Sequence, residues 1–178
     1  AATRRTTDYR KTDTNDDANT KAGSDGKETG EGGDDMLRPV DERNLLIGGF
    51  GDDDIVGGSE LDVIIGDGAY IMVTSAQGAG FGGFGVSGNL TVARTHGPGY
   101  GGDDRILGLE GADLLMGGRG ADVIEGSVGE NVIVGDYAEA KNYTEGALAE
   151  ISTTSMAPSE TEGGNEDVLT GGPDRDLI

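Results

Sequence analysis

Residues 117–125 read Gly-Gly-Arg-Gly-Ala-Asp-Val-Ile-Glu. The stretch has the form Gly-Gly-x-Gly-x-Asp-x-U-x, where U is a large aliphatic residue. Glycines at the first, second and fourth positions suit a tight turn, because they tolerate positive φ and let backbone carbonyls point inward. The residues that follow suit a short strand, whose eighth position faces one side. One unit therefore predicts a turn followed by a strand.

The same nine-residue spacing recurs along the chain, with two interruptions. Every sixth position is Asp or Asn, and every eighth position is Leu or Ile. The sixth positions are Asp35, Asn44, Asp53, Asp62, Asp104, Asp113, Asp122, Asn131, Asp167 and Asp176. The eighth positions are Leu37, Leu46, Ile55, Ile64, Ile106, Leu115, Ile124, Ile133, Leu169 and Ile178. This regularity predicts stacked turns and strands, with the aliphatic side chains stacked inside.

The units form three blocks, which we place at residues 30–67, 99–136 and 162–178, the last being the start of a block. Because the pattern continues to the final residue, we interpret the chain as an internal piece of a longer polypeptide. Residues 1–29 are interpreted as the end of a preceding hairpin and a polar loop.

The two interruptions, residues 68–98 and 137–161, each predict a β-hairpin that projects from the repeats. In the first, Tyr70–Thr74 and Leu90–Arg94 flank a glycine-rich tip that carries Phe81 and Phe84. Those aromatics either form an adhesive contact or pack on their own repeats.

Composition restricts the classes of function. The 178 residues carry a net charge of −21, with 35 Gly, 4% aromatic residues and no Cys. By itself this favours disorder, or a fold that something else completes. We expect no enzyme, because too few large apolar residues exist to close a pocket and His96, the only histidine, has no recognisable catalytic partner. The acidic field opposes nucleic acid, and no apolar run is long enough for membrane insertion.

The repeat resembles the RTX (repeats-in-toxin) family of calcium-binding proteins, for which this nonapeptide is the signature. The resemblance covers the three blocks. It implies an all-β fold: a parallel β-roll or β-solenoid of calcium-binding nonapeptides, with two units to a coil, interrupted by β-hairpin excursions. It also implies several Ca²⁺ ions, because aspartate oxygen is a ligand that calcium prefers.

In the family, each ion lies between the turns of units i and i+2, held by sixth-position side chains and turn carbonyls. The implied metal ligands are therefore all ten sixth positions. The implied pairs are Asp35 with Asp53, Asn44 with Asp62, Asp104 with Asp122, and Asp113 with Asn131. More sites follow if coils stack across the interruptions. The alternative is that these side chains only cap turns.

Several units depart from the pattern, and we expect weaker ion binding there. The unit at residues 39–47 lacks the turn glycines, Glu60 and Asp174 replace the fourth-position glycine, and Asn131 brings no charge. Two further acids, Asp67 and Asp136, each follow a glycine at the end of a block. They are either extra ligands or turn formers.

The expected function is a calcium-rigidified structural or adhesive module of a large secreted, extracellular or cell-surface protein. Its expected partners are neighbouring repeat blocks of the same chain, and copies of itself in a filament or surface layer. The alternative is a secretion and folding module attached to an exported enzyme or toxin. Bound Ca²⁺ would offset the negative charge and add folding free energy. Composition then predicts disorder only without calcium.

Overall fold

The computed structural model describes residues 33–38, 44–75, 88–95, 101–143, 150–153 and 165–178. This part of the chain is all β, so it holds no helix that could cross a membrane. Some of the sequence-based expectations concern residues that the structure does not describe. These are residues 1–29, the hairpin tip with Phe81 and Phe84, and His96.

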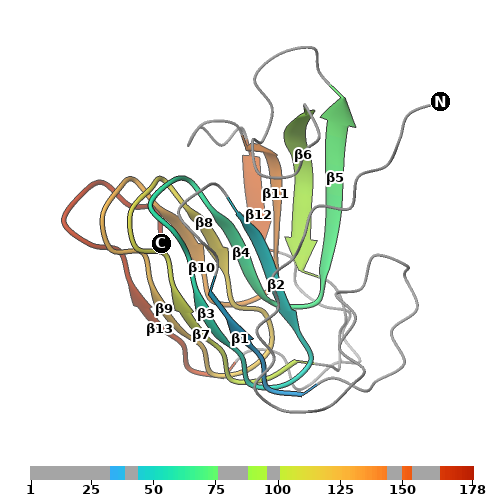
Figure 1. The fold of residues 1–178 in the computed structure, drawn as a ribbon, viewed down its shortest axis with the longest axis vertical. Coiled ribbons are helices and arrows are strands. Elements are labelled where there is room, and N and C mark those ends of the chain that lie inside the picture. Colours follow the sequence, from blue (N-terminus) through green and yellow to red (C-terminus); the bar gives the residue numbers. More distant parts are fainter. Residues whose placement is uncertain (1–32, 39–43, 76–87, 96–100, 144–149, 154–164) are drawn as a thin grey trace.

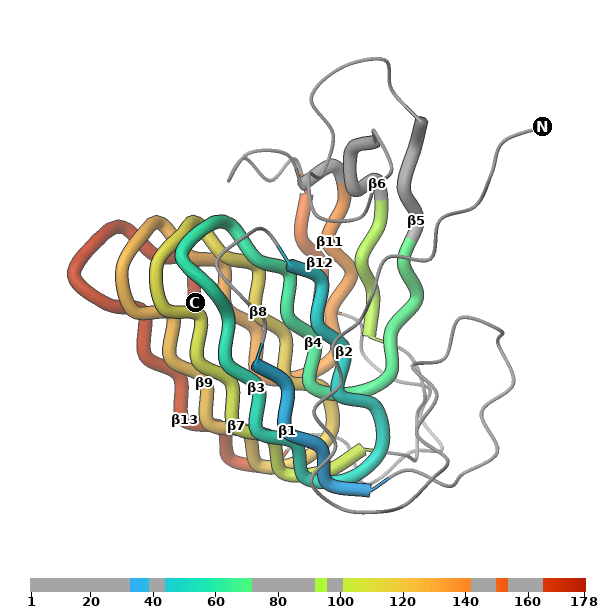
Figure 2. Tube along the Cα trace, viewed as in Figure 1, coloured from blue at the N-terminus to red at the C-terminus, as the bar shows by residue number. Residues whose placement is uncertain are grey.

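Two parallel sheets contain the repeat strands (Figure 1). Sheet A consists, in order, of β1 (Met36–Leu37), β3 (Asp54–Val56), β7 (Arg105–Leu107), β9 (Val123–Glu125) and β13 (Val168–Thr170). Sheet B consists, in order, of β2 (Leu45–Gly49), β4 (Val63–Asp67), β8 (Leu114–Met116) and β10 (Val132–Val134). The chain alternates between the two sheets, so one strand of each makes a coil, and Figure 2 shows these coils stacked. The arrangement is consistent with the β-roll that the resemblance implies.

The coils stack across both interruptions without a change of register. Strand β3 pairs with β7, with Ile55 opposite Ile106, although the first interruption separates them in sequence. Strand β9 pairs in the same way with β13, with Ile124 opposite Leu169. The inserted segments therefore leave the stack and return to it one coil further on.

The prediction that eighth positions stack inside is confirmed. They form one apolar cluster between sheets A and B, consisting of Leu37, Leu46, Ile55, Ile64, Ile106, Leu115, Ile124 and Ile133, with Leu169 partly buried against it. Ile178 differs, since 62% of it is exposed. The inner core is therefore a stack of aliphatic side chains, one from each nonapeptide except the last.

The interruptions form antiparallel strands, as predicted, but they do not project separately from the repeats. Their strands are β5 (Ala69–Ser75), β6 (Gly88–Thr95), β11 (Ala138–Tyr143) and β12 (Glu150–Thr153). Strand β6 pairs with β11, so the two hairpins join into sheet C, in the order β12-β11-β6-β5. The two predicted hairpins are confirmed, as β5 with β6 and β11 with β12, but they form one joint sheet that packs against the repeats.

The contact is with the outer face of sheet B, which is apolar. Seventh and ninth positions of the sheet B strands point away from the inner core and carry large apolar residues, namely Leu45, Ile47, Val63, Ile65, Leu114, Met116, Val132 and Val134. Ala93, Ala138 and Ala140 of sheet C are buried against them. In sheet A the same positions include Asp54, Arg105 and the exposed Glu125. Sheet B therefore needs a cover, and sheet C provides it.

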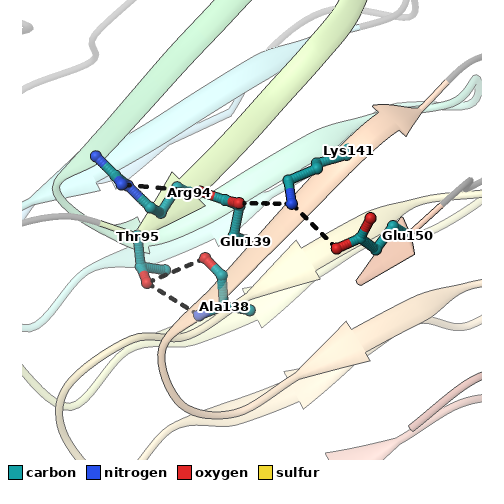
Figure 3. Close-up of polar contacts among 6 residues, drawn as sticks. All are labelled: Arg94, Thr95, Ala138, Glu139, Lys141 and Glu150. Carbon is teal, nitrogen blue, oxygen red and sulfur yellow. Dashed lines mark hydrogen bonds and ion pairs between the residues drawn. The ribbon is translucent and has the colours of Figure 1, made fainter. Parts of the chain in front are cut away.

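Polar contacts fasten the two hairpins to each other (Figure 3). The Thr95 hydroxyl donates to the Ala138 carbonyl at 3.4 Å and accepts from the Ala138 N–H at 3.1 Å. On the exposed side, Glu139 faces Arg94 at 3.7 Å and Lys141 at 3.1 Å. Exposed ion pairs of this kind contribute little, so apolar burial provides most of the attachment.

We expect Val63→Ala to lower the free energy of unfolding in calcium by about 2 kcal/mol, because it removes buried methyl groups beneath sheet C. Val168→Ala is the matched control, since Val168 holds the same position in sheet A but is 58% exposed. Its effect should stay below about 0.5 kcal/mol. Chemical denaturation measures both, and equal effects would contradict the assignment of sheet C as a cover.

Candidate metal centre

The sixth-position side chains form two columns, one along each side of the stacked coils. In the first column, each backbone N–H donates to the Oδ1 atom of the sixth-position side chain in the next coil. The bonds are Asp35 to Asp53 (2.7 Å), Asp53 to Asp104 (2.8 Å), Asp104 to Asp122 (2.8 Å) and Asp122 to Asp167 (2.9 Å). One carboxylate oxygen of each acceptor thus joins two coils.

The second column repeats the arrangement. Its bonds are Asn44 to Asp62 (2.7 Å), Asp62 to Asp113 (2.8 Å), Asp113 to Asn131 (3.0 Å) and Asn131 to Asp176 (2.9 Å). The structure thus brings together all four pairs that the resemblance implies. It also brings together Asp53 with Asp104 and Asp62 with Asp113, across the first interruption. All ten sequence-predicted site residues therefore lie in these columns.

The second carboxylate oxygen has a different environment. The Oδ2 atoms of Asp104, Asp113 and Asp122 are buried and have no hydrogen-bond donor among the described residues. A buried charged oxygen without a partner costs several kcal/mol, so native proteins rarely keep one without a ligand. These atoms are therefore suited to bind a positively charged partner.

The first-position glycines show where that oxygen points. A Cβ atom on Gly117 would lie 2.1 Å from Asp122 Oδ2 and 2.4 Å from the carbonyl oxygen of Gly135 in the next coil. On Gly57 it would lie 2.5 Å from both Asp62 Oδ2 and the Gly108 carbonyl. A carboxylate oxygen of one coil and a carbonyl of the next thus face the same point.

This donor set fits calcium, which binds several oxygen ligands and accepts backbone carbonyls among them. Among the described residues, no three acidic or histidine side chains lie close enough to hold a metal by themselves. An ion between two coils would therefore be held by sixth-position carboxylates together with turn carbonyls such as those of Gly117 and Gly135.

Burial raises the pKa of four carboxyl groups in the columns, those of Asp62, Asp104, Asp113 and Asp122. The pKa of Asp104 rises from 3.8 to about 9, first through desolvation and then through the charges of Asp53, Asp67 and Asp122. Desolvation, reinforced by Asp62, raises the pKa of Asp113 to about 8. Without a cation, the folded state thus favours the protonated forms of Asp104 and Asp113.

The two asparagines place an amide where other units place a carboxylate. The Nδ2 atom of Asn44 donates to Asp62 Oδ1 at 2.8 Å. The Nδ2 atom of Asn131 donates to the Gly129 carbonyl at 3.1 Å and faces Gly126, where aspartate would present Oδ2. Asparagine therefore preserves the bond between coils but removes a charged oxygen, which supports weaker ion binding at these units.

The first interruption lies inside a nonapeptide rather than between two of them. A Cβ atom on Gly66 would lie 2.0 Å from Asp104 Oδ2, which is the relation that Gly117 has to Asp122. Gly66 and Asp67 thus occupy the first two positions of the unit that ends with Asp104 and β7. Gly135 has the same relation to Asp167, at 2.0 Å. Sequence spacing could not show this, because the inserted residues hide the nine-residue step.

Asp67 and Asp136 occupy equivalent positions but differ in environment. Asp67 is fully buried, and its Oδ1 atom has no hydrogen-bond donor among the described residues. Desolvation and the charge of Asp122 raise the pKa of Asp67 to about 7. Asp136 is exposed at the last coil. Their repeated Gly-Asp motif was visible in the sequence, but this difference was not.

The metal-free chain should become less stable as pH rises. The unfolded chain releases its carboxyl protons near pH 4, whereas folded Asp104 and Asp113 hold theirs up to about pH 9 and pH 8. Between those limits each group lowers the free energy of unfolding by about 1.4 kcal/mol per pH unit. We expect circular dichroism in EDTA to show more β structure at pH 5 than at pH 8. Saturating calcium should reverse this order, because calcium needs the ionised form.

Asp104→Asn should flatten this pH dependence, because it removes the buried titrating group. Asp34→Asn provides the matched control, since it removes the same charge from an exposed side chain. If both variants flatten the profile equally, general charge repulsion is the cause and the assignment to Asp104 fails.

Gly117→Ala should lower stability in calcium by about 1–3 kcal/mol, since the new methyl group would collide with Asp122 Oδ2 and the Gly135 carbonyl. Gly33→Ala is the control, because nothing lies within 4 Å of its Cβ position. We expect that change to stay within about 1 kcal/mol. Thermal denaturation in calcium compares them, and a tolerated Gly117→Ala would show that the point facing Asp122 is open.

Comparison with known protein families agrees with this geometry. A family model for the RTX calcium-binding nonapeptide repeat (4 copies) matches residues 40–69 and 98–136. Searches of curated proteins and of solved structures gave no match. The matched segments contain both sides of the first interruption and most of the two columns. The chain therefore contains RTX calcium-binding nonapeptide repeats within residues 40–136.

Proposed function

We propose that this calcium-binding repeat module serves as a structural or adhesive segment of a large extracellular or cell-surface protein, and not as an enzyme. The observation that carries the proposal is that the repeats and the insertions form separate sheets. Sheet A continues in register through both interruptions and sheet B through the first, whereas sheet C lies on one side of them (Figure 1). The repeats thus supply a regular scaffold, and the insertions supply a variable surface.

A scaffold of this kind extends by addition of coils. Each coil contacts only its neighbours and adds one strand spacing of about 4.8 Å, so we infer a solenoid whose length follows the number of units. Among the described strands, β13 pairs on one side only, with β9. Backbone groups at such a sheet edge can pair with a further coil. Neighbouring repeat blocks of the same chain are the proposed partners, and copies of the molecule in a filament or layer are a further proposal.

The charge distribution supports an extracellular setting. Columns of buried carboxylates repel one another unless a cation lies between them, so the folded state depends on available calcium. Extracellular modules typically bind calcium with dissociation constants of about 10⁻⁴–10⁻³ M. The same dependence supports the second candidate, a secretion and folding module that folds after export.

We expect calcium at millimolar concentration to convert a largely unordered chain into β structure. Far-UV circular dichroism at pH 7.5 measures the transition, and EDTA should reverse it. Magnesium is the control, because it demands octahedral geometry and dehydrates reluctantly, so it should be much less effective. An unchanged spectrum in calcium would refute calcium-dependent folding.

Sedimentation velocity and electron microscopy of the calcium-loaded chain then test assembly. Growth of ordered filaments or layers with protein concentration favours the structural role. A monomer at all concentrations that folds reversibly with calcium favours the secretion and folding role.

A further inference from the structure

The unit that the first interruption splits carries an acid where the intact units of sheet A carry glycine. In the intact units, the second-position residues Gly49 and Gly118 have positive φ values of 119° and 127°. In the split unit that position is Asp67, the last residue of β4. It pairs in register with Gly49 of the preceding coil. Asp67 therefore brings a side chain into the turn at a place where its neighbours in the stack have none.

Two glycines provide the room for this carboxylate. A Cβ atom on Gly101 would lie 2.2 Å from Asp67 Oδ1, and one on Gly118 would lie 2.3 Å from Asp67 Oδ2. Gly101 is the residue at which the chain resumes the split unit, and Gly118 belongs to the next coil. The carboxylate of Asp67 thus lies between two successive turns of the stack.

The hydrogen bonding of Asp67 extends beyond its own turn. A turn-forming aspartate accepts from backbone N–H groups a few residues away in its own loop. The Asp67 carboxylate interacts with the N–H of Gly102 in its own turn, and its Oδ2 atom also accepts from the N–H of Arg119, in the next coil. Asp67 Oδ1 is buried without a hydrogen-bond donor among the described residues, on a side chain that is 0% exposed. One oxygen therefore joins two coils, and the other lacks a partner.

Other free carboxylate oxygens lie nearby. The Oδ2 atoms of Asp104 and Asp122, in the same two coils, also have no donor among the described residues. Asp67 is close enough to interact electrostatically with both carboxylates. Three buried acids with free oxygens in two successive turns require a positive charge between them.

We propose that Asp67 is an additional calcium ligand, whose Oδ1 atom binds an ion held between the coils of Asp104 and Asp122. Turn carbonyls complete its coordination, because the acids do not form a closed cluster by themselves. The inference rests on calcium binding by the repeats and adds a ligand outside the sixth positions. Since β5 begins two residues after Asp67, the ion also fixes the start of the inserted hairpin.

Asp67→Asn tests the proposal, and Asp136→Asn is the matched control. Asp136 holds the equivalent position after Gly135, but its carboxylate is exposed. Native mass spectrometry and calorimetric titration with calcium count the ions and measure their affinities. We expect Asp67→Asn to bind one ion fewer, or to bind one ion at least tenfold more weakly. Asp136→Asn should match the wild type.

A second readout separates a ligand from a merely structural acid. In EDTA, Asp67→Asn should be at least as ordered as the wild type, because it removes a buried charge and keeps an oxygen for the Arg119 N–H. In calcium it should be less stable than the wild type. If it is at least as stable as the wild type in both conditions and its ion count is unchanged, Asp67 is not a ligand.

A crystal structure of the wild type with terbium provides a test that does not depend on a variant folding. Anomalous scattering should place an ion within about 2.3–2.6 Å of an Asp67 oxygen. Ions at the sixth-position columns but none at Asp67 would overturn this inference alone. A wild-type chain that takes up no ion at all would refute calcium binding by the repeats as well.

Discussion

Buried carboxylate oxygens that face carbonyl oxygens are the constraint on which the rest of the structure depends. One oxygen of each column acid accepts a backbone N–H from the preceding coil, as Asp122 does from Asp104. This bond fixes the spacing of the coils, and in Asp104, Asp113 and Asp122 the second oxygen has no donor among the described residues. The fold that aligns the strands thereby concentrates negative charge along two lines. Stacking of coils with ionised carboxylates and binding of a cation are therefore thermodynamically coupled, because each favours the other.

Apolar residues are distributed differently in sheets A and B. Both sheets contribute aliphatic residues to the inner column, but only sheet B is also apolar on its outer face. That face is covered by strands from both insertions, which come from separate interruptions of the repeat. The first hairpin alone supplies two of the strands of sheet C, and the second completes the sheet. Neither insertion is therefore an independent appendage.

The local features were predictable from the sequence, and the long-range ones were not. Spacing alone located Asp122 in a turn and Ile124 in the core, because both depend on residues within one nonapeptide. The apolar seventh and ninth positions, such as Val63 and Ile65, were present in the sequence as a signal that sheet B is buried on two faces. The role of Gly66 in the unit of Asp104 was hidden, since it depends on segments that meet only after folding.

The split nonapeptide also bears on how such a protein can change over evolutionary time. Residues 67 and 101 lie beside each other in one turn, so the ends of the inserted segment are already held together. The entropy of closing a loop grows only with the logarithm of its length. Segments of different size can therefore be grafted at this point, and the neighbouring coils keep their phase. A turn of this kind is a position where inserted segments can add new surface while the stacked coils stay unchanged.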